Sequence, residues 1–513
     1  MVSRSGNEAL MTTKRTSLLL TKVGNSPHAF GIVDEVRKLM PGVWILGIES
    51  SEDSSGHPFD EPVANTNQLL LGNYPTIPES SRYLPPAIFR RFERDIGHLL
   101  RLADRVFVHD LRDHVRHHGH DRVPTDTYDT RLQMVMQHAV YWNHILESRQ
   151  VQAIVFPNLP HGMWDASLLS VSKARDIPHM FFHEVPPFRG TLYLYEGSDS
   201  IGDLESGRRI LSAARTRYGL IEDSPDRKLK LWKQANIVQT ELELSVQHSQ
   251  VRNIKRIVAL LGRPRKVRSI FRAIQRRRSA RLSQKSEKAA YSNVDLGENF
   301  FFLELQLPHN ATTLVKGREY PRQTDLIRYI AAALPDSQEL VIRESPRFHE
   351  RKLYRPTNFW SEISKIPNVR VIDTRHSLRE ISERAAVVVE LSYSSLALLH
   401  LLSGKSVVFL TDTHLGPMPN MFLLANFSRL SDALQTARDA SVIDEREVIS
   451  SCLRAHINDL SPSTIESALS WYPSAESSDP SYGERLRLNV ARAIASWCLS
   501  RVSEWDGYKL IGD

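Results

Sequence analysis

The sequence predicts an α/β protein with two Rossmann-like domains, on three observations. Short apolar runs of strand length alternate with helical segments in both halves of the chain, an order that favours parallel sheets. The chain has 513 residues, too many for one hydrophobic core. A strongly basic segment separates the halves. We therefore expect an N-terminal α/β domain over 1–220, a basic helical linker over 221–295, a C-terminal α/β domain over 296–480 and a closing helix over 481–513.

The first half begins with a short strand, a glycine turn and a helix. The apolar run VQAIVF is its clearest buried strand, whereas residues 50–84 are rich in Ser, Pro, Asn and Gly and indicate a loop. The expected elements are strand 17–23, helix 27–39, strand 43–48, helices 86–105 and 128–146, strand 151–156, helix 165–174 and strand 177–182.

The second half has five apolar runs with helices between them, which predicts a doubly wound open sheet. Such sheets bind ligands beyond the carboxyl ends of their strands, so two facing domains would place a site at their interface. We expect the helix 482–502 to pack across both halves. The other elements are strand 300–305, helix 323–333, strand 339–343, helix 359–364, strand 369–372, helix 377–385, strand 386–390, helix 394–402 and strand 406–410.

Composition excludes several classes of protein. A hydrophobic fraction of 41% and a charged fraction of 24% are unlike those of disordered or collagenous chains. Two cysteines cannot form a disulfide framework or a cysteine-rich zinc site, and the histidines of 109–120 match zinc-site spacing only at His114 and His118. No run reaches the ~18 apolar residues of a membrane-spanning helix. We expect a cytoplasmic protein without metal or cofactor. Peripheral attachment to the inner face of the membrane is a further possibility that this compartment allows.

Positive charge is concentrated in one segment, which we call the basic arm (252–288). It holds fourteen Lys/Arg and one acid, a net charge of +13, so the remainder of a chain of charge +7 carries −6. A solvated interdomain helix is one interpretation, and a patch for anionic lipid or anionic glycan is another. No recognisable motif supports nucleic-acid binding. The patch residues would be Arg263, Arg265, Lys266, Arg276, Arg277 and Arg278.

Several blocks resemble the bacterial capsule polysaccharide biosynthesis family, Kdo-transferase-like glycosyltransferases of the two-Rossmann-domain (GT-B) class. The resemblance implies a nucleotide-sugar donor in the C-terminal domain and a glycan or glycolipid acceptor in the N-terminal domain. It is carried by LQLPHNATT (305–313), LPDSQELVIRESP (334–346), PNVRVID (367–373) and VVVELSYSSLALLHLLSGKSVVFL (387–410), and less strongly by 99–105 and 156–179.

Three polar positions depart from the pattern of that family. Pro308-His309-Asn310 replaces a Pro-Glu pair, Ser345 stands where a histidine is usual, and Leu399 replaces a glutamate. Either the donor differs or catalysis has been lost. The alternative function is therefore a catalytically inactive relative that binds a glycan or a partner in polysaccharide assembly.

The candidate donor-binding residues follow the strands of the second half. Arg343 suits a donor phosphate, with Glu344 orienting it, although a structural ion pair would explain both. Ser394 and Ser395 begin a helix whose N-terminus could bind phosphate, although serine is also a common N-cap. The full set is Gln306, Thr312, Thr313, Arg343, Glu344, Ser392, Ser394, Ser395 and Lys405.

The candidate catalytic residues lie on three loops. His161 and Asp165 follow the strand 151–156, Glu184 follows the strand 177–182, and His309 follows the strand 300–305. Histidine and carboxylate side chains can accept the proton of an acceptor hydroxyl.

Overall fold

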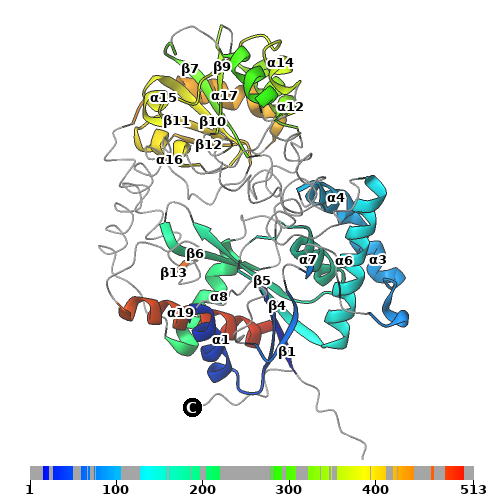
Figure 1. Cartoon of the computed structure of the whole chain (residues 1–513). Coiled ribbons are helices and arrows are strands. Elements are labelled where there is room, and N and C mark those ends of the chain that lie inside the picture. The colour runs from blue at the N-terminus through cyan, green and yellow to red at the C-terminus, as the bar shows by residue number, and fades with distance from the viewer. Residues whose placement is uncertain are drawn as a thin grey trace, which may run out of the picture.

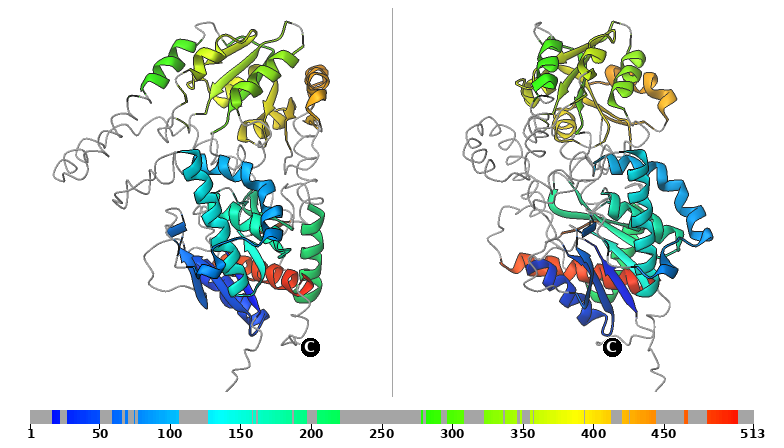
Figure 2. Two further views of the ribbon diagram at one scale, coloured as in Figure 1. Left: turned by 90° about the vertical axis from the view of Figure 1, so that its right-hand side faces the viewer. Right: turned by 45° about the vertical axis from the view of Figure 1, so that its right-hand side comes forward.

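The computed structural model describes two α/β units, each built on one sheet. The described residues are 16–21, 27–49, 59–65, 68–69, 74, 77–105, 127–157, 159–160, 162–185, 188–196, 204–219, 278, 281–291, 296–307, 322–335, 337–345, 348, 355–356, 358–392, 394–411, 420–424, 426–443, 464–466 and 480–501. Figure 1 shows the two sheets in separate lobes, and Figure 2 shows the same lobes from two further directions.

The first sheet has seven strands in the order β13-β6-β5-β4-β1-β2-β3. The strands β1 to β5 are parallel, and β6 pairs antiparallel with both β5 and β13. Their bounds are β1 Ser17–Leu20, β2 Trp44–Glu49, β3 Glu61–Asn65, β4 Val151–Phe156, β5 His179–Val185, β6 Phe188–Glu196 and β13 Thr464–Glu466.

Helices cover both faces of the first sheet. One core contains side chains of α3, α4, α6 and α7, and the other contains side chains of α1, α8 and α19. The helices are α1 Pro27–Leu39, α3 Pro86–Phe92, α4 Ile96–Arg105, α6 Tyr128–Ser148, α7 Met163–Ala174, α8 Leu204–Tyr218 and α19 Pro480–Arg501, with the short turns η1 Glu79–Ser81 and η2 Glu93–Asp95.

The second sheet has six parallel strands in the order β12-β11-β10-β7-β8-β9. Counted from β7, this is the order 6-5-4-1-2-3 of a Rossmann sheet read from one edge. The predicted fold class is therefore confirmed. The strands are β7 Phe300–Leu305, β8 Leu340–Glu344, β9 Val369–Ile372, β10 Ala385–Glu390, β11 Ser406–Phe409 and β12 Met421–Leu423.

The second sheet is also buried on both faces. Side chains of α12, α14 and α17 form one core, and those of α15 and α16 form the other. This explains the near-continuous apolar runs FFFLEL and AAVVVE, because parallel strands covered on both faces need apolar side chains on both. The helices are α12 Gln323–Ala333, α14 Phe359–Ile363, α15 Leu378–Arg384, α16 Ser395–Leu402 and α17 Leu430–Asp439, with the turn η6 Phe427–Arg429.

The closing helix differs from its expected placement. α19 packs against α1 and α8 of the first unit, and the indole nitrogen of Trp497 donates to Glu196 of β6 at 3.1 Å. The strand β13, inside the range expected for the C-terminal domain, also joins the first sheet. The apolar face of α19 was visible in the sequence, but its packing partner depends on the tertiary path of the chain.

Three further strands were not expected. β3 lies inside the predicted loop, because a short edge strand containing Pro62 gives little pattern. β6 does alternate in period two, in FRGTLYLYE, and turns back along β5 as a hairpin partner. β12 has only three residues at the edge of the second sheet. Within the described part of the chain, no helix has the length and hydrophobicity needed to cross a membrane.

Candidate functional site

The carboxyl ends of three adjacent strands in the second sheet carry polar side chains. β10 ends at Glu390, β8 ends at Glu344, and Gln306 follows the last residue of β7. The strand that follows β7 in sequence, β8, lies on one side of it and β10 lies on the other, so the strand order reverses between β7 and β10. Ligands of open α/β sheets bind at such a switch point. This edge is the candidate functional site.

Two glutamates and an arginine lie in a row on one face of the three strands. Glu304 of β7 pairs with Arg343 of β8, and the pairing of Leu303 with Val389 sets Glu390 beside Glu304. Side chains two residues apart on a strand share a face. The residues two positions earlier all belong to the core beneath α15 and α16: Phe302, Val341 and Val388.

The Arg343 guanidinium is buried and bonded within the protein. One terminal nitrogen donates to the Glu304 carboxylate at 2.8 Å, and the other donates to the backbone carbonyl of His376 at 2.6 Å. The side chain is 2% exposed, and its Nε has no hydrogen-bond partner among the described residues. Arg343 is therefore part of a structural ion pair, but its partner is Glu304 and not the Glu344 that the sequence suggested.

Glu390 is fully buried and both of its carboxyl oxygens are hydrogen-bonded. The Ser394 hydroxyl contacts Oε1 at 2.6 Å, and the Gln306 amide donates to Oε2 at 3.1 Å. Burial raises the pKa of the Glu390 carboxyl well above its usual range, and the neighbouring Glu304 carboxylate raises it further. Glu390 thus favours the protonated form more than an exposed glutamate does.

Ser394 is the N-cap of α16. Its hydroxyl accepts from the backbone N–H of Ala397 at 3.0 Å while it contacts Glu390. The Ser394 hydroxyl, predicted to contact a phosphate, is therefore bonded to a carboxyl group of the protein. Ser395 is the first residue of the same helix, and Ser392 is buried just beyond the end of β10.

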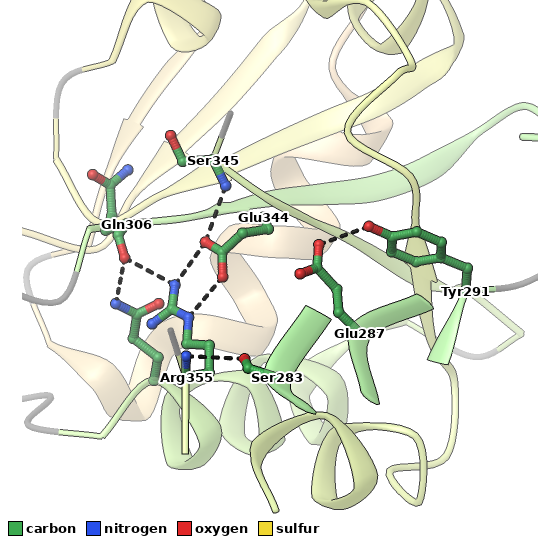
Figure 3. A network of polar contacts seen from close by, with 8 residues as sticks. Ser283, Glu287, Tyr291, Gln306, Glu344, Ser345 and Arg355 are labelled. Atoms are coloured by element: carbon green, nitrogen blue, oxygen red, sulfur yellow. Dashed lines mark hydrogen bonds and ion pairs between the residues drawn. The ribbon is translucent and has the colours of Figure 1, made fainter. Parts of the chain in front are cut away.

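Glu344 points to the opposite face of the sheet from Arg343, because successive strand residues alternate. It therefore pairs with Arg355 and cannot orient Arg343 as expected. Arg355 donates to both Glu344 oxygens, at 2.7 and 2.8 Å, and to the carbonyl of Gln306 at 3.2 Å (Figure 3). Burial raises the pKa of the Glu344 carboxyl, and the Arg355 charge opposes that rise.

A helical segment, residues 281–290, closes this side of the site. The Ser283 hydroxyl accepts from the backbone N–H of Arg355 at 3.2 Å. Tyr291 donates to the buried carboxylate of Glu287 at 2.7 Å, and these groups lie beside Glu344 (Figure 3). Gln306 joins both faces of the sheet, since its amide contacts Glu390 and its carbonyl contacts Arg355.

Lys405 lies at the other end of the sheet, away from these groups. It directly precedes β11, and its ammonium donates to the carbonyls of Ser382 at 2.9 Å and Ala385 at 3.2 Å, where α15 ends and β10 begins. A residue before a parallel strand lies at the amino edge, whereas the ligand edge is the carboxyl one. Lys405 thus binds the carbonyl groups at the C-terminal end of α15 and does not join the other predicted donor-binding residues.

The other predicted residues divide into two groups. His161, His309, Thr312, Thr313 and the patch residues other than Arg278 lie outside the described residues, as do the histidines of 109–120. Asp165 is 1% exposed in the first turn of α7, where its carboxylate accepts from the N–H of Ala166 at 2.9 Å. Glu184 lies within β5 and not after it, because β5 continues to Val185 opposite β6.

Sequence reasoning missed Glu304, Glu390 and Arg355. The first two left a signal, because each is a lone acid at or near the end of an apolar strand, in FFFLEL and AAVVVE. A charge at the carboxyl end of a buried strand is costly unless it is paired or used. Arg355 left no such signal, since it follows a polar stretch without the periodicity of a helix or a strand. Among the described residues, no group of three His, Cys, Asp or Glu is arranged to hold a metal ion.

No family model matches the chain, and no curated protein matches it. Solved structures match at low identity. The UDP-GlcNAc 2-epimerase of Methanocaldococcus jannaschii is 10% identical, with a TM-score of 0.26 over 87% of this chain and 99% of that one. The spinosyn rhamnosyltransferase SpnG is 10% identical, with a TM-score of 0.23 over 87% of this chain and 100% of that one. HepE of Anabaena, in complex with UDP, is 11% identical, with a TM-score of 0.22 over 95% and 98%. Because these scores are below 0.5, the architecture here is taken from strand order and pairing alone.

Proposed function

We propose that this chain is a nucleotide-sugar-dependent glycosyltransferase of bacterial surface (capsular) polysaccharide biosynthesis. The observation that carries the proposal is the polar cluster of Gln306, Glu390 and Ser394 at the switch point of a Rossmann-ordered sheet. The GT-B resemblance of the sequence blocks around these strands supports the same class. The acceptor would be a glycan or glycolipid, and the protein would attach peripherally to the inner face of the membrane.

The cluster offers groups that suit the hydroxyls of a sugar or a ribose. A carboxyl, an amide and a hydroxyl supply both donors and acceptors at one edge. The buried arginines are each neutralised by a glutamate, so we do not assign them to the donor phosphate. Thr312 and Thr313, which follow β7, stay the predicted phosphate contacts, and His161, Asp165, Glu184 and His309 stay the predicted catalytic residues.

A nucleotide-binding experiment tests this proposal. Thermal unfolding of the full chain is followed with CMP, CDP, UDP and GDP. A nucleotide present at 100 times its Kd stabilises the folded state by about 2.7 kcal/mol. We expect one nucleotide to raise the Tm, and Ser394→Ala to weaken its binding at least tenfold.

Ser377→Ala is the matched control for this variant. Ser377 is the N-cap of α15 and accepts from the N–H of Glu380 at 3.0 Å, but it follows β9 and lies off the switch point. The Ser377→Ala variant removes the same kind of helix cap as Ser394→Ala and should leave the affinity for the nucleotide unchanged. Absence of stabilisation by all four nucleotides would overturn the proposal, as would equal loss in both variants.

The alternative is a catalytically inactive relative that binds a glycan or an assembly partner. The observation favouring it is that Arg343, Glu344 and Ser394 are all bonded to other groups of the protein. The replaced histidine and glutamate positions of the family pattern point the same way. Calorimetric binding of an acidic oligosaccharide, together with no nucleotide binding and no release of nucleotide from any nucleotide sugar, would support this alternative.

A further inference from the structure

The helical segment 281–290 presents two faces of opposite character. Four basic side chains, Arg278, Arg281, Lys285 and Lys288, are exposed and spaced by three, four and three residues, which places them along one side of a helix. We call them the basic stripe. None of them forms an ion pair with any residue that the structure describes. Leu282, directly beside the stripe, is 47% exposed.

The opposite face of the same segment is fixed to the second unit. Ser283 and Glu287 are each 2% exposed, and Ser283 accepts from the backbone of Arg355. Tyr291 bridges to Val371 of β9 and packs against the core beneath α12 and α14. Arg355 in turn contacts Glu344 and the carbonyl of Gln306 (Figure 3). The helix that carries the basic stripe is therefore bonded to the candidate site through its opposite face.

We propose that the basic stripe is a docking surface for an anionic lipid bilayer. A planar anionic surface can contact one whole side of a helix at once, and the four cations on that side, which pair with no described residue, match it in charge. The exposed leucine at the margin of the stripe favours a bilayer over a soluble polyanion, because only the bilayer offers an apolar layer beneath the charges. The ten further Lys/Arg of the basic arm precede the stripe in sequence and add charge of the same sign.

The anchoring of the buried face gives this docking a consequence. Because Ser283 is bonded to Arg355, a bilayer bound by the stripe would hold the carboxyl edge of β7 and β8 close to the membrane surface. A lipid-linked acceptor would lie there. This consequence rests on the proposed function, whereas the docking itself does not, since it is measured without any nucleotide sugar.

The test is sedimentation of the full chain with two kinds of vesicle. One contains phosphatidylcholine alone, and in the other about one lipid in three is the anionic phosphatidylglycerol. The variant replaces Arg278, Arg281, Lys285 and Lys288 by Gln. The control replaces four exposed arginines of the first unit, Arg90, Arg94, Arg101 and Arg209, by Gln. Both variants lose four positive charges, so net charge alone cannot distinguish them.

We expect the wild type to bind only the anionic vesicles, and binding to fall as salt rises. Each basic residue near such a surface contributes about a fivefold factor in affinity, so the stripe variant should bind at least tenfold more weakly. The control variant should stay within about twofold of the wild type. Hydrogen exchange of 281–291 should slow when vesicles are added.

Several results would overturn the proposal. These are equal binding to both kinds of vesicle, equal loss in the two variants, binding to heparin but not to vesicles, and unchanged exchange of 281–291 in bound protein. Loss of nucleotide binding with intact vesicle binding would count against the proposed function alone.

Discussion

The two sheets resemble each other in order but differ at their carboxyl ends. In the first sheet, β1 and β4 end in Leu20 and Phe156, and the buried polar groups nearby are the neutral pair of Tyr74 with His138 and the carboxyl of Asp165. In the second sheet, the corresponding central strands end beside buried charges. A buried ion pair is weak evidence for stability, because desolvation offsets much of the attraction. Among the described residues, what sets the second sheet apart is its two buried pairs, Glu304 with Arg343 and Glu344 with Arg355.

The largest expected effect breaks the charged edge. Arg355→Met leaves the Glu344 carboxylate buried without its partner, which should cost about 3–5 kcal/mol of unfolding free energy. Urea unfolding at pH 7 measures it. The double variant with Glu344→Met should recover most of the loss, since the carboxylate that lost its partner is then removed as well. A double variant as unstable as Arg355→Met would show that packing on Phe348 and Phe359, and not the charge, decides the effect.

The neutral pair of the first unit predicts sensitivity to acid. Burial lowers the pKa of His138 from 6.5 to about 3. Below pH 6.5 the unfolded chain binds a proton that the folded chain does not, so stability falls as pH falls toward 3, by up to about 1.4 kcal/mol per pH unit. His138→Gln should flatten this part of the stability–pH curve.

The charged edge predicts the opposite dependence on pH. The pKa of Glu390 is raised on folding, so its contribution is fully present below the unfolded value of 4.5 and is lost as pH rises through the folded value. Glu390→Gln keeps the shape and cannot ionise. Relative to the wild type, this variant should become more stable as pH rises above 4.5, in denaturant titrations from pH 4 to 8. A constant difference across that range would contradict the raised pKa.

Two helix caps give a smaller contrast within the second unit. Ser377→Ala should cost about 1 kcal/mol, as loss of an N-cap usually does. Ser394→Ala removes a cap and also the hydroxyl bonded to Glu390, so it should cost about 1 kcal/mol more. Thermal unfolding without nucleotide measures both. Equal costs would mean that Glu390 finds another partner.

The smallest effect is expected at an ion pair of the first unit. Arg91 and Asp176 approach to 2.5 Å, but their side chains are 52% and 76% exposed. Solvent screens such a pair, so Asp176→Asn, which leaves the bond from Arg91 to the Ala174 carbonyl in place, should change the free energy of unfolding by less than about 0.5 kcal/mol. A loss of stability close to that of Arg355→Met would contradict the expectation that buried ion pairs matter more to stability than exposed ones.

Much of the fold could be predicted because its signals are local. The helix 27–39 and the strands 300–305 and 369–372 have the bounds that periodicity predicted, since each buries a face that its own residues define. At the candidate site, the sequence also pointed to Gln306, Arg343, Glu344 and Ser394. It could not assign their partners, because Arg355 and Glu304 reach them only through strand pairing and chain return.

The sequence by itself determined two mainly parallel sheets, the basic arm and a polar carboxyl edge on the second sheet. Strand length, charge and the residues at strand ends can all be read from neighbouring residues. Tertiary structure decided which face each charge takes, that Lys405 lies at the amino edge, and that α19 returns to the first unit. Those outcomes depend on contacts between residues tens to hundreds of positions apart. The energy of such a contact depends on both partners, so neither segment determines it alone.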